Sequence, residues 1–232
     1  MFKKIIFVLL AAVVAANYAN AAGVGFYAAA GNGTQNVDFN HSYIPGGSGS
    51  MIYSKTDPGT IILNFGMFYE IPGLFEMSDN SFLGVSAEYG LLHSGEVLFE
   101  TSYPPYNFSS QLKMQGYTIP VTFYYKYKTS KRFAVKGGLG FTYLSLDWRT
   151  RTGSFNGSNM TATTKSDSKV MPHIGTGIEW IFSRFVTLGG ELTYGFNGKM
   201  SADYVNPAYT EKYTRDFSGL VMKLVLRVYV LQ

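Results

Sequence analysis

The stretch FAVKGGLGFTYL, Phe133 to Leu144, contains the residue types of a phosphate-binding loop. A lysine next to closely spaced glycines can cradle a phosphate when the glycines open the N-terminus of a helix. No helical period follows Gly140, because the apolar residues around it alternate with a period of two. The stretch is therefore predicted to be a strand in which Lys136, Gly138 and Gly140 share one face.

Three histidines, His41, His93 and His173, are the other residues suited to acid–base chemistry. His93 precedes Ser94, and a hydrolase acting on lipid would need these two side chains within hydrogen-bonding reach. Adjacent residues of a strand point to opposite faces, which argues against this pair. No cluster has the spacing of metal ligands, and the absence of cysteine excludes thiolate sites and disulfides. No catalytic residue, metal or cofactor is predicted.

The N-terminus, MFKKIIFVLLAAVVAANYANAAG, has the pattern of a secretory signal peptide. Lys3 and Lys4 supply the positive region, a short apolar segment follows, and Ala19–Ala21 fits a cleavage site between small residues. This pattern predicts a signal peptide over residues 1–21 and a single exported domain over 22–232.

The composition excludes several classes of protein. Charged residues make up 15% of the chain, against about a quarter in ordinary soluble proteins. Without Lys3 and Lys4 the formal net charge falls from +4 to +2, which is too small to indicate nucleic acid as a partner. After the N-terminus no apolar run reaches the ~18 residues of a transmembrane helix.

The rest of the chain reads as eight segments of alternating hydrophobicity, at 23–31, 60–71, 81–93, 114–128, 133–147, 169–182, 186–197 and 217–231. Long connections (32–59, 94–113, 148–168 and 198–216) alternate with short ones (72–80, 129–132 and 183–185). This asymmetry is typical of outer-membrane barrels. The predicted fold is all-β, an eight-stranded antiparallel up-and-down transmembrane β-barrel.

The alternation places one apolar face on every segment. Residues such as Ile119, Val121 and Phe123 lie on this face, and no formal charge does so in the strand centres. A lysine or arginine facing lipid at the midplane would cost about 2–4 kcal/mol. Aromatic residues cluster near the segment ends, as in interfacial girdles. Pro120 and Pro172 lack the ladder N–H, so each is predicted to mark a bulge or a frayed end.

The segments GYTIPVTFYYKY, FAVKGGLGFTYL and IGTGIEWIFSRFVTLGGELTYGF resemble consecutive strands of the small OmpA-like outer-membrane β-barrel family. The resemblance covers residues 22–232. It implies a barrel in the outer membrane of a Gram-negative-type bacterium, in contact with outer-membrane lipid and inserted by the barrel assembly machinery. Relatives commonly end in an aromatic residue that aids insertion, whereas this chain ends in Gln232.

The opposite face of the segments carries a balanced set of ionisable residues. Eight strands enclose only enough space for side chains, so these residues are predicted to form an interior network. Lys136 is expected to pair with Glu179, and Glu191 with Lys223 or Arg227. Two interpretations remain open, a fixed structural network and an ion-conducting path with exchanging pairs. The predicted set is Glu70, Glu88, Lys126, Lys136, His173, Glu179, Glu191, Lys223 and Arg227.

Tyrosines among Gly, Ser and Asn in the long connections have the composition of recognition surfaces. The candidates are Tyr43, Tyr53, Tyr204, Tyr209 and Tyr213. The sequence therefore predicts a structural, surface-exposed barrel with a role in adhesion or host interaction through a surface ligand. The alternatives are a narrow porin-like channel for small solutes and a lipid-modifying enzyme.

Overall fold

The computed structural model describes the backbone of residues 23–43, 50–72, 80–93, 97–103, 106–155, 158–159, 163–206 and 209–231. Every regular element within these ranges is a β-strand, which confirms the all-β class. No helix in this part of the chain is long and apolar enough to cross a membrane.

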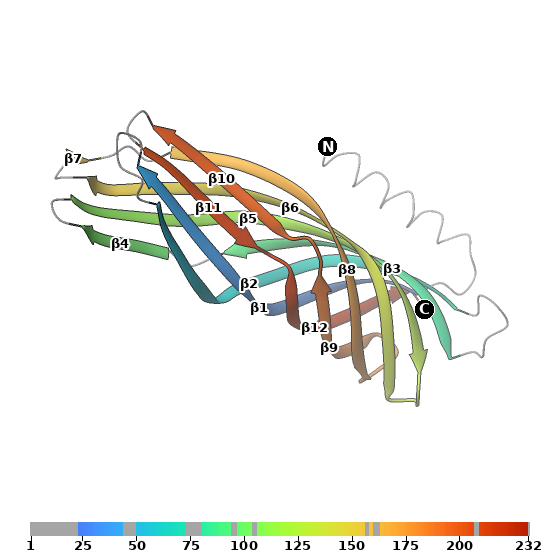
Figure 1. Ribbon diagram of the computed structural model, residues 1–232. Coiled ribbons are helices and arrows are strands. Elements are labelled where there is room, and N and C mark those ends of the chain that lie inside the picture. Colours follow the sequence, from blue (N-terminus) through green and yellow to red (C-terminus); the bar gives the residue numbers. More distant parts are fainter. Residues whose placement is uncertain are drawn as a thin grey trace.

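Eight strands form the closed barrel in Figure 1, and each pairs antiparallel with the next along the chain. The last strand returns to the first through a ladder from Val24↔Leu231 to Gly33↔Val221, and this pairing closes the wall. The predicted eight-stranded up-and-down barrel is therefore confirmed. Its strands are β1 (Gly23–Tyr43), β2 (Ser50–Pro72), β3 (Ser81–His93), β5 (Tyr106–Lys128), β6 (Phe133–Phe155), β8 (Thr163–Ile181), β9 (Val186–Gly195) and β12 (Gly219–Leu231).

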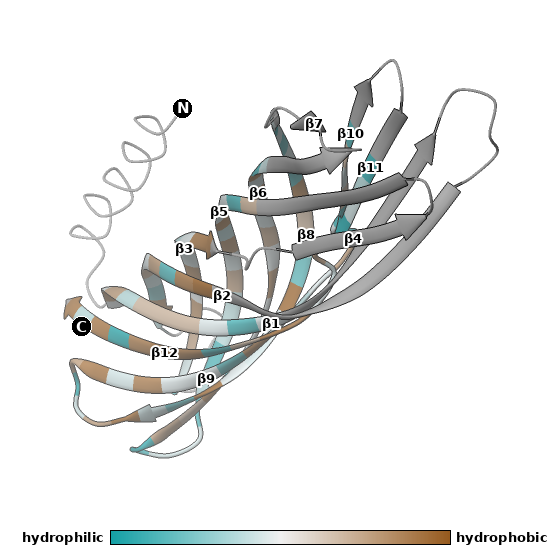
Figure 2. Cartoon of the chain, turned by 90° about the vertical axis from the view of Figure 1, so that its left-hand side faces the viewer, coloured by the Kyte–Doolittle hydropathy of each residue, from teal (hydrophilic) through white to brown (hydrophobic). Residues whose placement is uncertain are grey.

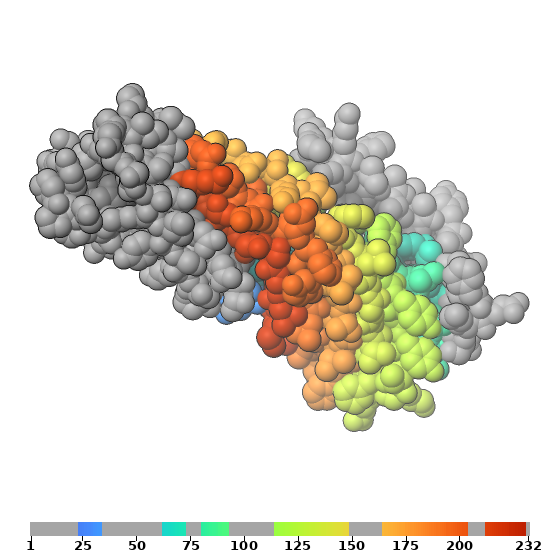
Figure 3. Space-filling view, viewed as in Figure 1, coloured from blue at the N-terminus to red at the C-terminus, as the bar shows by residue number. Residues whose placement is uncertain are grey.

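The outer surface of the barrel carries the apolar face that the alternation predicts. Leu139 on β6 and Leu224 on β12 are both 61% exposed, and the brown bands in Figure 2 show such residues recurring along the strands. Inward neighbours such as Ala134 and Val225 are almost fully buried. The space-filling view in Figure 3 shows the side chains of β6, β8, β9 and β12 as one continuous wall.

Aromatic side chains form two belts on this outer surface. At the end with the short turns, the centre of the Trp180 ring lies 4.6 Å from the centre of the Phe182 ring and 6.4 Å from that of Phe133. At the other end, the Tyr194 and Phe196 rings are 4.9 Å apart. Two belts flanking an apolar band are the pattern of interfacial girdles.

The long connections are largely β-structure, so their prediction as loops was wrong. Beyond the apolar band β1, β2, β5, β6 and β8 continue, and four further strands join them: β4 (Val97–Tyr103), β7 (Ser158–Asn159), β10 (Lys199–Asn206) and β11 (Tyr209–Asp216). In Figure 1 these extensions project from the barrel at the upper left. In β10 the buried Met200 and Ala202 alternate with the exposed Lys199, Ser201 and Asp203, so one face of this extension is covered and the other is polar.

Strands β10 and β11 continue β9 and β12 after an irregularity. The β9–β12 ladder ends at Gly195↔Gly219, and the β10–β11 ladder begins at Lys199↔Asp216. Between them, the three residues 196–198 stand opposite the two residues 217–218. Asn197 has a φ of 56°, and Ser218 accepts a hydrogen bond from the Gly198 N–H at 2.7 Å. Above this point β11 pairs with β1, whereas no backbone ladder joins β10 to β8 among the residues described. Lys169 spans this seam and donates to the Lys199 carbonyl at 3.0 Å.

Of the two prolines, Pro172 lies at a ladder end as predicted, whereas Pro120 does not mark a bulge. Opposite Pro120 the β3–β5 ladder lacks the pairs of Glu88 and Tyr89, but it resumes in the same register, so the expected bulge is absent there. Pro172 lies just beyond the last β8–β9 pair, and its carbonyl accepts the Phe196 N–H at 2.9 Å. Its missing donor therefore falls at the end of a ladder, in agreement with the predicted end position.

Candidate functional site

The half of the lumen near the short turns is crossed by a network of charged side chains centred on Arg227. Its Nη1 lies 3.4 Å from Glu70 Oε1, its Nε 3.3 Å from Glu179 Oε1 and its Nη2 3.2 Å from Glu191 Oε1. The guanidinium also lies 5.1 Å from the centre of the Phe68 ring. Arg227 is 2% exposed, and three carboxylates from strands β2, β8 and β9 thus converge on one buried cation.

Glu70 is the most heavily bonded carboxylate of this network. It pairs with Lys126, and it accepts hydrogen bonds from the Tyr124 hydroxyl at 2.9 Å and the Tyr229 hydroxyl at 3.2 Å. Lys126 Nζ in turn lies 3.7 Å from Glu179 Oε2. Buried charges need this degree of pairing, because removing one partner leaves the other uncompensated.

Two further pairs extend the network toward the middle of the lumen. Lys136 Nζ bonds Glu191 Oε1 and lies 3.9 Å from Glu179 Oε1, so its closest partner is not the one that the sequence predicted. Glu191 also contacts Arg227, one of its two predicted partners. The other, Lys223, pairs instead with Glu88 at 3.0 Å.

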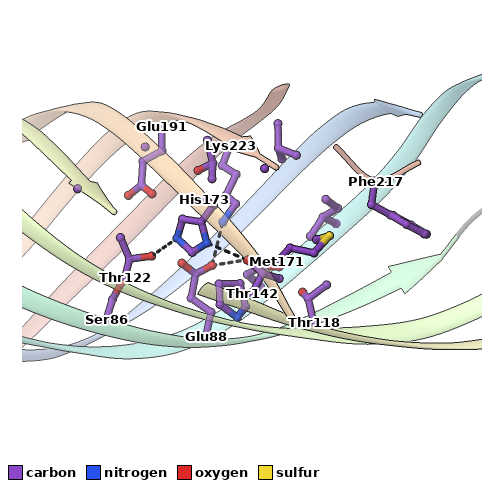
Figure 4. Close-up of a pocket in the computed structure, with 18 of the residues that line it drawn as sticks. Ser86, Glu88, Thr118, Thr122, Thr142, Met171, His173, Glu191, Phe217 and Lys223 are labelled. Atoms are coloured by element: carbon purple, nitrogen blue, oxygen red, sulfur yellow. Dashed lines mark hydrogen bonds and ion pairs between the residues drawn. The ribbon is translucent and has the colours of Figure 1, made fainter. Parts of the chain in front are cut away.

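His173 lies above these pairs, with both ring nitrogens bonded to hydroxyl groups. Its Nε2 is 2.9 Å from Thr122 Oγ1 and its Nδ1 is 3.0 Å from Thr142 Oγ1, as Figure 4 shows. A Cβ on Gly140 would lie 2.0 Å from the Val121 carbonyl oxygen and 2.9 Å from the same Nε2, so this glycine of the FAVKGGLGFTYL stretch allows the close approach of both the neighbouring strand and the imidazole. The stretch is a barrel strand, β6, and no helix begins in it.

A cavity of about 100 Å³ surrounds His173. Figure 4 shows Glu88, Lys223 and Glu191 on one side of it and Met171 and Phe217 on the other. A water molecule needs about 10–15 Å³ of such space, so several waters fit, whereas drug-sized ligands occupy about 300 Å³ or more. The lining is mixed, with apolar side chains such as Leu144 and Met171 beside polar ones such as Glu88 and His173, and the cavity has room for water or a very small solute.

The outer half of the lumen is filled mainly by apolar side chains, with the buried Arg215 donating to Met114 Sδ, and the sequence reasoning missed this cluster. Trp148 and Leu144 are fully buried, and Met171 connects this cluster to the cavity below. A signal was present, because Leu144, Leu146 and Trp148 stand at inward positions of an alternating strand. The outer apolar cluster contains Ile62, Leu92, Met114, Leu144, Leu146, Trp148, Met171, Met200, Ala202 and Tyr213.

Tyr213 was predicted as a surface recognition residue, and this is wrong. It is 0% exposed, because β11 turns this side chain into the outer apolar cluster. The side chains of the other four candidates, Tyr43, Tyr53, Tyr204 and Tyr209, lie outside the described residues, although their backbones belong to β1, β2, β10 and β11.

The structure brings together no catalytic or metal-binding group among its described side chains. No three of His, Asp and Glu are grouped to hold a metal ion there. His173 contacts two threonine hydroxyls, and no carboxylate is bonded to its ring. The side chains of His41 and His93 and the whole of Ser94 lie outside the described residues, so the lipid-hydrolase alternative stays a prediction.

Several solved structures are similar to this chain. A major outer membrane protein of Thermus thermophilus is similar with 13% identity, a TM-score of 0.47, and coverage of 89% of this chain and 98% of that one. OprG of Pseudomonas aeruginosa is similar with 12% identity, a TM-score of 0.46, and coverage of 90% and 97%. Ail, the attachment invasion locus protein of Yersinia pestis, gives 9% identity, a TM-score of 0.37, and coverage of 87% and 98%.

Comparison of the sequence with curated proteins gives no match. The model of the outer membrane protein beta-barrel domain matches residues 5–214, which is most of the chain. The closed antiparallel wall, the outward apolar band and this match together show that the protein belongs to the outer-membrane β-barrel family, as a small OmpA-like eight-stranded member located in the bacterial outer membrane.

Proposed function

We propose that the protein is a sealed structural barrel that carries extended β-strands outward from the membrane for contact with an external ligand. The observation that carries this proposal is the filling of the lumen at two levels. The Arg227 network occupies the periplasmic half, and the outer apolar cluster occupies the other half. Two successive barriers favour a scaffold over a pore.

The outward extensions supply the surface for such contact. β1 runs to Tyr43 and β2 begins at Ser50, well past the girdle, and the β10–β11 hairpin pairs with β1 in this region. Rigid strands position recognition residues more accurately than free loops. Adhesion or host interaction through Tyr43, Tyr53, Tyr204 and Tyr209 is the role proposed for this outer portion.

Whole-cell binding tests this role. Cells that display the protein are compared with cells that display a variant in which Tyr43, Tyr53, Tyr204 and Tyr209 are all serine, on a panel of glycans and extracellular-matrix proteins. Binding above that of cells lacking the protein, lost in the variant, is expected. A folding control is the faster migration of the unboiled variant on a denaturing gel. A correctly folded variant that binds as well as the wild type would contradict the proposal.

A narrow channel is the second candidate, favoured by the polar cavity and by carboxylates that share several cations. Glu179, for example, lies within 4 Å of Arg227, Lys126 and Lys136, so a cation has alternative partners at hand. Single-channel recording in planar bilayers separates the two candidates. The sealed barrel shows no conductance above background, whereas discrete steps that change with Lys136→Met would support the channel.

Delivery to the outer membrane is part of the proposal. Residues 1–21 act as the cleaved export signal, and the barrel assembly machinery inserts the folded strands. N-terminal sequencing of the purified mature protein is expected to begin at Ala22. Retention of residues 1–21 would contradict this part of the proposal without affecting the sealed barrel.

A further inference from the structure

The periplasmic end of the barrel contains a second cavity, of about 430 Å³, between the β5–β6 turn and the β8–β9 turn. Its volume is within the range of small-ligand sites. Lys126, Glu179 and Tyr229 form its inner wall, and residues of the turns 129–132 and 182–185 form its rim. We name this cavity the periplasmic vestibule.

Among the described residues, the lining of the vestibule has an excess of positive charge. Its only described carboxylate is Glu179, which Arg227, Lys126 and Lys136 already compensate. Four further cations line it, and none has a carboxylate within 4 Å in the part of the chain that the structure describes. These four are Lys128, Lys131, Arg132 and Arg184.

A buried hydroxyl without a partner lines the same cavity. Thr187 is 3% exposed, and its Oγ1 makes no hydrogen bond to any described group. Burying a hydroxyl without a hydrogen bond is unfavourable, so this donor would gain from an acceptor that reached it at the wall of the vestibule. It is independent of the charge excess, and it points to an occupant that accepts hydrogen bonds.

We propose that the periplasmic vestibule binds a phosphate-bearing anion. Guanidinium groups suit phosphate because they donate paired hydrogen bonds to its oxygens, and lysines add point charge. Arg132 and Arg184 stand on the two turns that flank the cavity, and the proposed anion lies between these turns. The Thr187 hydroxyl lies deeper and donates to a further phosphate oxygen. Two sources carry this chemistry, a phospholipid headgroup of the inner leaflet and a free phosphate compound of the periplasm.

Isothermal titration of the full-length mature barrel in a nonionic detergent with pyrophosphate is the first measurement. The variant Arg132→Gln/Arg184→Gln is expected to bind at least about tenfold more weakly, because losing even one charge-assisted interaction costs about 1.4 kcal/mol. The matched control Lys199→Gln/Lys212→Gln removes two exposed cations at the opposite end and is expected to bind as the wild type. An equal loss of pyrophosphate affinity in both variants would mean that net charge alone explains the binding, and it would overturn the site.

Lipid nanodiscs distinguish the two sources. Protein in phosphatidylcholine discs is compared with protein in discs containing phosphatidylglycerol, and native mass spectrometry detects retained lipid. Retention of phosphatidylglycerol that requires Arg132 and Arg184 assigns the site to a headgroup. Pyrophosphate binding without such retention assigns it to a soluble anion. Absence of both contradicts the proposal.

Thr187→Val separates ligand binding from folding. This nearly isosteric change removes a hydroxyl that has no hydrogen bond to lose, so the urea midpoint of the barrel is expected to stay the same or rise. Anion affinity, in contrast, is expected to fall several-fold. A variant with unchanged stability and unchanged affinity would show that the hydroxyl does not face the ligand, and would overturn this placement.

Discussion

Lys136 bonds Glu191 across the position of Gly177, which lies between them on the intervening strand. Gly177 is the register partner of both residues, on β6 and on β9. A Cβ on this glycine would stand 2.9 Å from the Gly190 carbonyl oxygen, 3.0 Å from Lys136 Cε and 3.1 Å from Glu191 Cγ. The absent side chain therefore provides the space in which the two long side chains meet.

Gly177→Ala tests this relationship. The added methyl has to displace both side chains, and such overpacking costs about 1–3 kcal/mol. Gly137→Ala on β6 is the control, because nothing lies within 4 Å of its Cβ position. Urea unfolding in detergent, followed by the gel shift of unboiled samples, is expected to show a lower midpoint for the first variant only. Equal midpoints would contradict the crowding at Gly177.

Lys136 is expected to couple more strongly to Glu191 than to Glu179. A double-mutant cycle of Lys136→Met with Glu191→Gln should give an interaction energy of about 1–3 kcal/mol, because contacting charges are not additive. The same cycle with Glu179→Gln should give less, since that pair is 3.9 Å apart. The reverse order of the two coupling energies would argue for the pairing expected from strand adjacency.

Arg227→Met is expected to be the most damaging single substitution in the periplasmic half. It removes the cation shared by Glu70, Glu179 and Glu191, and an uncompensated buried charge costs about 3–5 kcal/mol. Arg184→Met, at an exposed turn residue, should change the free energy of unfolding by no more than about 0.5 kcal/mol. A similar small effect at both positions would show that the network adds little stability.

Truncating one methionine inside the barrel and one on its outer surface compares the contribution of the two positions to stability. Met200→Ala deletes a side chain that is 3% exposed within the outer apolar cluster, and the resulting cavity should cost about 2–5 kcal/mol. Met222→Ala deletes one that is 62% exposed on the lipid face, where solvating tails fill the space. Thermal unfolding in lipid vesicles is expected to rank the first variant well below the second. Equal melting temperatures would deny a packed outer lumen.

The lipid face should reject charge in proportion to depth. Leu224→Arg, in the middle of β12, is expected to cost about 2–4 kcal/mol, and Phe185→Arg, in a periplasmic turn, about 0–1 kcal/mol. Folding into vesicles from urea measures both. If Leu224→Arg folds as readily as Phe185→Arg, the apolar band does not lie where the girdles place it.

Local sequence patterns were sufficient to predict the strands that form the wall of the barrel. Side chains on a strand alternate, so residues such as Val121 and Phe123 reported an apolar environment on one face from their spacing alone. Antiparallel neighbours follow from short turns, which gave the eight-strand order. The ladders beyond the membrane gave a weaker signal, because β10 has only two buried apolar residues, Met200 and Ala202, between polar ones.

The contents of the lumen depended on the tertiary structure. Sequence position places Glu191 and Lys223 on the inner face, but it does not fix which side chains meet across a closed barrel. There Lys136 reaches over Gly177 to a strand that is not its neighbour, and Lys223 finds Glu88. Likewise, only closure turned Tyr213 from a residue of a polar loop into a fully buried one. The sequence determined the face of each residue through a local period, whereas the partners depended on distances that exist only once the ring of strands is complete.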